Sequence, residues 1–296
     1  MPLSIRDTVA VAVRRAIDPI DQLLVLDPGR RGVARFFRPG GALGAARALG
    51  RARRVLITTG FALGPGLSET DGPPGAAVLG RALRRLGVRV RYVIDAATVP
   101  ALRAVLEVLG EPREIELFPD GDAGVAARRV LARLSSTHLV AVERPGRSRD
   151  GAYRSADGHA VGAWNRPLDA LFLVPSRATT VGVGDGGNEI GMGVIPRHAL
   201  KAAGVPPRIA SVVPVDHLVV AGVSNWGAYG IVAHLGRLAG RNLLHSGAEE
   251  GRLIEACVKA GAVDGITRRR EATVDGVPLA AHAGIVELMN ALGGQR

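Results

Sequence analysis

Short apolar runs alternate with segments of helical periodicity through the first half of the chain. Val55–Phe61 has the length and β-branched character of a buried strand, and residues 79–86 then carry apolar side chains at helical spacing. The succession continues with strands expected at 88–95, 114–118 and 137–142 and helices at 99–109 and 127–134. Such alternation predicts an α/β fold: a mostly parallel sheet with helices on both faces, in three α/β/α layers. We expect a single domain over residues 1–296.

The remaining segments extend this pattern with shorter elements. Two Asp-Gly pairs, Asp264-Gly265 and Asp275-Gly276, are typical of hairpin turns. Strands are expected at 179–183, 210–215 and 218–222; helices are expected at 3–26, 198–203, 228–235, 247–260 and 279–292, with a weaker helical pattern at 40–53.

The composition excludes several classes of protein. No run approaches the roughly 18 apolar residues that would cross a bilayer, and the first residues lack the features of a secretory signal. We therefore expect a cytoplasmic protein with no membrane partner. Cys257 is the single cysteine, which excludes an internal disulfide framework, and its setting predicts a small core residue. The strong preference for arginine over lysine is typical of a GC-rich bacterial genome.

A net charge of +11 raises the question of a nucleic-acid partner. The arginines are scattered over the faces of expected helices, and aromatic residues make up 3% of the chain, too few for a base-stacking surface. We therefore expect no nucleic-acid partner. The charge is compatible with a small anionic substrate, and a homo-oligomer is left open.

The segment Thr179–Gly193 is a strand that runs into a glycine-rich turn with polar side chains. Asp185, Asn188 and Glu189 stand among its glycines, which include Gly186 and Gly187. Glycine lets the backbone approach a ligand closely because it has no Cβ. The segment therefore predicts a binding or catalytic site.

Carboxylates recur where expected strands end. Glu69 and Asp71 precede a helix, Glu143 ends a strand, and Asp150 lies in the polar loop that follows it. Asp71 is also suited to capping a helix, and both interpretations are retained. Several hard oxygen ligands in one cleft would suit Mg²⁺ or Mn²⁺. The chain lacks a P-loop and a complete dinucleotide fingerprint, so no nucleotide cofactor is expected.

Two arginine-bearing loops and one helix start complete the candidate set. Arg30 and Arg31 lie in a turn and are interpreted as solvated surface residues, whereas the loop of Arg144 and Arg147 follows a strand and favours carboxylate binding. Ser224-Asn225 is suited to capping the next helix, whose free N–H groups form an anion site.

Four motifs together resemble the C-terminal catalytic domain of the D-glutamate cyclase family. They are Glu69–Ala76 (ETDGPPGA), Glu143–Arg147 (ERPGR), Gly182–Gly193 (GVGDGGNEIGMG) and Ala221–Gly227 (AGVSNWG). The resemblance extends from about Asp27 onward. It implies a hydro-lyase that converts D-glutamate to 5-oxo-D-proline and water, in bacterial cytoplasm or in mitochondria.

The chemistry of that reaction assigns hypothetical roles to the candidate residues. The amine must lose a proton, and the side-chain carboxylate must be neutralised before it is attacked. We hypothesise catalytic roles for Asp185, Glu189 and Asn188, metal binding by Glu69, Asp71 and Asp185, and substrate binding by Arg144, Arg147, Ser224, Asn225, Gly186 and Gly187. A metal-dependent phosphohydrolase is the alternative that uses the same carboxylates, and a basic nucleic-acid-binding protein is a weaker one.

Overall fold

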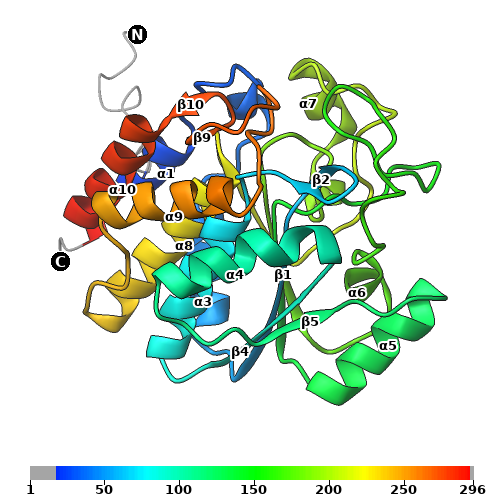
Figure 1. Cartoon of the computed structure of the whole chain (residues 1–296), viewed down its shortest axis with the longest axis horizontal. Coiled ribbons are helices and arrows are strands. Elements are labelled where there is room, and N and C mark those ends of the chain that lie inside the picture. Colours follow the sequence, from blue (N-terminus) through cyan, green and yellow to red (C-terminus); the bar gives the residue numbers. More distant parts are fainter. Residues whose placement is uncertain (1–17, 294–296) are drawn as a thin grey trace, which may run out of the picture.

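The computed structural model describes residues 18–293 and is built on one six-stranded sheet (Figure 1). Its strands are β1 (Arg54–Thr59), β4 (Arg89–Ile94), β5 (Ile115–Leu117), β6 (His138–Val142), β7 (Thr179–Gly184) and β8 (His217–Val220). They lie in the order β5-β4-β1-β6-β7-β8, and every neighbouring pair is parallel. The expected α/β class is confirmed. The strand order reverses between β1 and β6, the kind of position where doubly wound sheets bind ligands.

Helices cover both faces of the sheet. One face carries α1 (Pro19–Leu24), α2 (Gly41–Leu49), α3 (Pro73–Arg85), α4 (Val99–Val108), α8 (Ser224–Ala239), α9 (Gly247–Lys259) and α10 (Leu279–Gly293), which share the largest core cluster. The other face carries α5 (Ala123–Leu134) and α6 (Ala170–Leu173), with α7 (Arg197–Ala202) beside the loop after β7. Short 3₁₀ helices occur at Val33–Arg35, Ala96–Thr98 and Met192–Val194.

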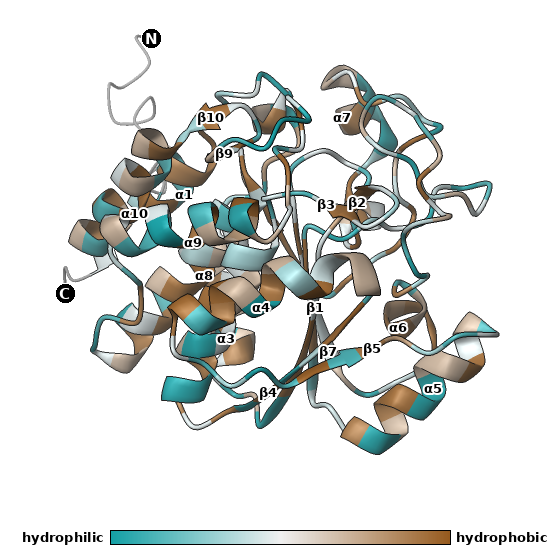
Figure 2. Ribbon diagram, in the orientation of Figure 1, coloured by the Kyte–Doolittle hydropathy of each residue, from teal (hydrophilic) through white to brown (hydrophobic). Residues whose placement is uncertain are grey.

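Successive side chains along a strand point to opposite faces of the sheet, so they belong alternately to two hydrophobic cores, one on each face. Val55 and Ile57 of β1 belong to the cluster under α3 and α8, whereas Leu56 packs on the opposite side with α5. Figure 2 shows both hydrophobic and hydrophilic bands on α5, and its Ala127 and Val130 are buried. The expected helix at 127–134 therefore forms because one apolar stripe covers the sheet.

Two expected elements differ from the structure. Residues 210–215 do not form a strand; Ser211 makes an isolated bridge to Ser148, and the Val213 carbonyl accepts hydrogen bonds from Gly191 and Gly193. The apolar alternation there serves to cover the glycine-rich loop and not to pair in a sheet. Asp264-Gly265 is not a hairpin, because the Asp264 side chain instead accepts hydrogen bonds from the backbone of residues 266 and 267.

Other expectations are confirmed. Asp275-Gly276 joins the antiparallel strands β9 (Thr273–Val274) and β10 (Val277–Pro278), and Cys257 is buried. A further hairpin, β2 (Ala62–Gly64) with β3 (Leu67–Ser68), links β1 to α3. Residues 3–17 of the expected first helix lie outside the described residues. Between residues 18 and 293, no helix has both the length and the apolar character needed to cross a bilayer.

Gly222 explains part of the AGVSNWG motif and provides a test of the packing. Its N–H donates to the Leu24 carbonyl at 2.8 Å, and a Cβ at this position would lie 1.7 Å from the Leu26 carbonyl oxygen. We predict that Gly222→Ala lowers the free energy of unfolding by about 3 kcal/mol through this overpacking, measured by urea titration. The control Gly284→Ala on α10 meets open space and should add about 0.5–1 kcal/mol. Equal effects of both substitutions would contradict the packing.

Candidate functional site

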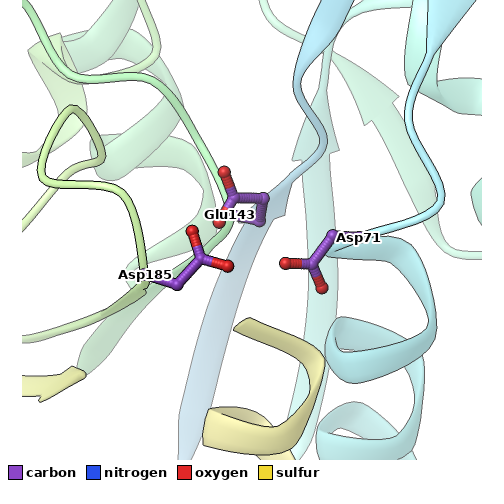
Figure 3. Close-up of side chains that lie close together, drawn as sticks. All are labelled: Asp71, Glu143 and Asp185. Carbon is purple, nitrogen blue, oxygen red and sulfur yellow. The ribbon is translucent and has the colours of Figure 1, made fainter. Parts of the chain in front are cut away.

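Three carboxylates converge at the carboxyl ends of the central strands. Asp71 follows the β2–β3 hairpin after β1, Glu143 follows β6, and Asp185 follows β7. One oxygen from each lies within 4.8 Å of the others, and all three side chains are buried. Figure 3 shows them directed toward one another. Because β6 pairs with both β1 and β7, the ends of these strands necessarily lie side by side.

Asp71 is positioned by the N-terminus of α8. Its Oδ2 accepts from the Ser224 N–H at 2.9 Å and its Oδ1 from the Asn225 N–H at 2.8 Å. Free N–H groups at a helix start favour a carboxylate there. Asp71 therefore caps a helix and belongs to the acidic cluster at the same time, although the helix is α8 and not α3, which directly follows it.

The side chains of Ser224 and Asn225 also form hydrogen bonds, with Glu143 and with the start of α3. The Asn225 Oδ1 accepts from the N–H groups of Gly72 and Gly75 at 3.1 and 2.7 Å, and so caps α3. The Ser224 hydroxyl donates to Glu143 Oε2 at 2.5 Å. Both residues, expected to bind substrate, are engaged in holding the acidic cluster in place.

The glycine-rich loop is fastened by its own glutamate. Glu189 accepts from the N–H groups of Gly186 and Gly187 at 2.8 and 2.9 Å. Asn188 donates to the Arg154 carbonyl at 2.8 Å. Glu189 therefore fixes the turn that carries Asp185, and it occupies the backbone donors that were expected to face substrate.

Arg31 and Asp275 belong to the site, and sequence reasoning missed both. The Arg31 guanidinium pairs with Asp185 and, at 2.6 Å, with Asp275. Its side chain is 20% exposed, so the interpretation of a solvated arginine was wrong. Asp275 sits in the predicted hairpin, but a turn signal does not reveal that the turn folds back over the sheet.

Arg144 and Arg147 are directed elsewhere. Arg144 is fully buried, pairs with Asp95 at 2.5 Å and donates to the Gly60 carbonyl at 2.9 Å. Arg147 makes a two-point pair with Asp169, with N–O distances of 2.6 and 3.0 Å. The structure therefore does not bring these two arginines to the acidic cluster.

A cavity of about 370 Å³ opens onto the cluster. Its walls include Glu69, which is buried beside the three converging carboxylates but is not one of them. The polar lining comprises Arg30, Arg31, Glu69, Glu143, Ser155, Asp185, Asn188, Glu189, Arg268 and Asp275.

Backbone strain is concentrated around this cavity. Five non-glycine residues of the described chain have positive φ, and four of them line the cavity: Arg30, Glu143, Arg268 and Asp275. A left-handed conformation is costly for such side chains and typically persists at functional sites. The backbone of the cavity is thus held in a conformation that local preference opposes.

Burial sets the electrostatics of the cluster. Removal from water, and then repulsion from Asp275, raises the pKa of Asp71 to about 8. Removal from water also raises the pKa values of Glu69, Glu143 and Asp185 well above their usual range, with neighbouring carboxylates adding to the effect. Arg31 lowers the pKa of Asp185 in part. The ionised cluster therefore needs more positive charge than Arg31 provides.

The donor set fits a metal ion. Asp71, Glu143 and Asp185 offer carboxylate oxygens, which hard divalent cations prefer, and the oxygens are close enough to share one ion. A bound cation stabilises carboxylates most when they are buried and nearby side chains do not neutralise all of their negative charge. The three residues can hold a metal. Sequence analysis had proposed Glu69, Asp71 and Asp185 as the metal ligands, whereas the converging group contains Glu143 and not Glu69.

These features define an α/β protein with an acidic cavity at the reversal point of a doubly wound sheet. The profile of the family described as D-glutamate cyclase-like, C-terminal, matches residues 20–290. The chain belongs to this family, which confirms the resemblance of its motifs.

One relative and two solved structures add detail. Over 243 residues the chain is 33% identical to the mitochondrial D-glutamate cyclase of Homo sapiens, covering 76% of this chain and 39% of that protein. An exopolyphosphatase-related protein from Bacteroides fragilis shares 8% identity at TM-score 0.43, covering 86% of this chain and 57% of the other. RecJ from Thermus thermophilus, in complex with Mn²⁺, shares 13% at TM-score 0.37, covering 93% and 39%. Neither structural likeness bears on function.

The raised pKa of Asp71 makes stability depend on pH and metal. In the unfolded chain this carboxyl ionises near 3.8, whereas in the folded protein it holds its proton up to about 8. Unfolding therefore releases a proton, and metal-free protein should lose stability as pH rises from 6.5 to 8. Bound Mn²⁺ would favour the ionised cluster, so the stabilisation that it provides should grow over the same range.

Thermal unfolding in EDTA and in Mn²⁺ at pH 6.5 and 8 measures both effects. Asp71→Asn should flatten the slope of the metal-free protein. A Tm in EDTA that is constant or rises with pH, together with a metal effect independent of pH, would contradict this electrostatic account.

Proposed function

We propose that the protein is a hydro-lyase that converts D-glutamate to 5-oxo-D-proline and water. The observation that carries the proposal is a buried carboxylate cavity built from the motifs of a D-glutamate cyclase-like family. Asp71, Glu143 and Asp185, which converge there, each come from a different one of these motifs.

The reaction forms one bond and breaks another. The amine nitrogen attacks Cδ of the side-chain carboxylate, a C–N bond forms, and one carboxylate oxygen leaves. The ammonium group carries three protons: one remains on the ring nitrogen, and two leave with the departing oxygen as water. The protein must move these protons and offset the charge of the attacked carboxylate.

Glu69 is suited to proton transfer. It is buried in the cavity wall, its Oε1 has no hydrogen-bond partner, and burial raises its pKa well above the usual range. A buried carboxyl group whose pKa is raised holds a proton more firmly than an exposed one, so it can take a proton from the amine and give it to the departing oxygen. Glu69 therefore takes the general acid–base role, and Asp185 contributes to charge balance.

The three converging carboxylates would hold the metal. A Mg²⁺ or Mn²⁺ ion bound by Asp71, Glu143 and Asp185 would supply a Lewis acid that polarises the attacked carboxylate. The α8 N-terminus orients Asp71, the Ser224 hydroxyl orients Glu143, and Arg31 orients Asp185. Apolar walls that include Phe61, Val205 and Ile209 limit the water around the curled substrate.

We infer that the protein binds a small anionic amino acid and neither a nucleotide nor a nucleic acid. Its cytoplasmic location stays a prediction. The phosphohydrolase alternative requires the same carboxylates, so substrate turnover is what distinguishes the two.

Chromatographic detection of 5-oxoproline tests the proposal. With Mn²⁺ present, purified protein should release it from D-glutamate and much less from L-glutamate, and EDTA should abolish the activity. Asp185→Asn and Glu69→Gln should each lower kcat/KM at least about 100-fold, as expected for loss of a charge-stabilising or proton-transfer group.

The matched control is Glu255→Gln, a half-exposed carboxylate on α9, which should leave turnover unchanged. Failure of the wild-type protein to form 5-oxoproline from D-glutamate with either Mg²⁺ or Mn²⁺ would contradict the substrate. Hydrolysis of phosphate esters in that case would favour the phosphohydrolase alternative.

A further inference from the structure

We propose that Arg30 and Arg268 form a carboxylate-binding subsite at the mouth of the cavity, which selects substrates with a second carboxylate away from the reacting one. This inference rests on the proposed function. For D-glutamate, the group bound there is the α-carboxylate, while the side-chain carboxylate reaches the acidic cluster.

The distribution of charge in the cavity is strongly uneven. Glu69, Glu143 and Asp185 are buried at its inner end, whereas Arg30 and Arg268 line the same cavity with exposed side chains. Arg31 also lines it but is engaged by Asp185 and Asp275. The mouth with Arg30 and Arg268 is therefore the part of the cavity where the second carboxylate of a ligand meets positive charge and not buried carboxylates.

Both arginines are available for a ligand. Arg30 makes none of the ion pairs found among residues 18–293, and Arg268 has a loose pair with Asp157 at 3.6 Å. That pair is exposed to solvent, so its contribution is small. A guanidinium presents paired N–H donors that match the two oxygens of a carboxylate.

The two loops hold these arginines in similar ways. The Asp27 carbonyl accepts from the Arg30 N–H at 3.1 Å, and the Asp264 carbonyl accepts from the Arg268 N–H at 3.0 Å. The Asp27 side chain also holds the N–H groups of residues 31 to 33, and the Asp264 side chain holds those of residues 266, 267 and 276. Each loop is thus fixed by one aspartate.

Each arginine is held in a left-handed backbone conformation, with φ of 54° at Arg30 and 61° at Arg268. Glycine would adopt these angles without strain, so an arginine at both positions indicates a use for the side chain. Figure 1 shows the loop after α1 and the β9–β10 hairpin at the same end of the molecule, and the Arg31–Asp275 ion pair joins them. Arg268 lies in the loop before β9, which the Asp264 side chain ties to the hairpin through the Gly276 N–H, so two loops distant in sequence present arginines to one cavity.

Kinetics of Arg30→Gln, Arg268→Gln and the double variant test the subsite in the Mn²⁺-loaded protein. Loss of charged hydrogen bonds to the α-carboxylate should raise the KM for D-glutamate about 10–100-fold in the double variant, with kcat changed little. Inhibition by 4-aminobutyrate, which is glutamate without its α-carboxylate, should stay within about twofold of wild type. Arg103→Gln, exposed on α4 outside the cavity, is the matched control.

An unchanged KM for D-glutamate, or an equal loss of D-glutamate and 4-aminobutyrate binding, would overturn the subsite. Calorimetric titration with glutarate separates this outcome from failure of the proposed reaction, because glutarate has no amine and cannot cyclise. Glutarate should bind the wild-type protein at least about 10-fold more tightly than the double variant. Equal affinity, or no binding to the wild type, would contradict the subsite whether or not D-glutamate is a substrate.

Discussion

Mutual repulsion among buried carboxylates is the constraint on which this site depends. Asp71, Glu143 and Asp185 lie within reach of one ion, and Arg31 is the cation that the fold itself inserts beside them. Like charges removed from water cannot all be ionised unless positive charge joins them. The cluster is therefore costly for the metal-free protein at neutral pH, and relief of this repulsion would favour the binding of a divalent cation.

The surrounding structure keeps the cluster together against that repulsion. Asp71 caps α8 while Asn225 of α8 caps α3, so two packed helices fix each other's N-termini and one carboxylate. Strained backbone at Glu143 and Asp275 directs two further carboxylates into the same space. The free energy for these arrangements comes from the large apolar core beneath, which α3 and α8 share with the sheet.

Much of the fold could be predicted from the sequence because periodicity reports which side of a segment is buried. The strands and helices of residues 54–142 followed from local pattern, and the glycine-rich turn predicted to form a site carries Asp185 into the cavity. Arg31 and Asp275 could not be found this way, since their roles arise from packing between loops far apart in the chain. Arg144 shows the converse: an arginine after β6 was expected to meet substrate, but its partner is the buried Asp95 at the end of β4, two strands away in the sheet. The apolar residues at 210–215 pack against the glycine-rich loop and do not form a sheet strand.

Anomalous diffraction at the manganese edge, from crystals grown with Mn²⁺ and 5-oxo-D-proline, tests the central claim most directly. The account predicts a manganese peak coordinated by Asp71, Glu143 and Asp185, with the product beside it in the cavity. Arg31 should remain next to Asp185. A cavity that contains the product but no manganese between these three carboxylates, at saturating Mn²⁺, would contradict it.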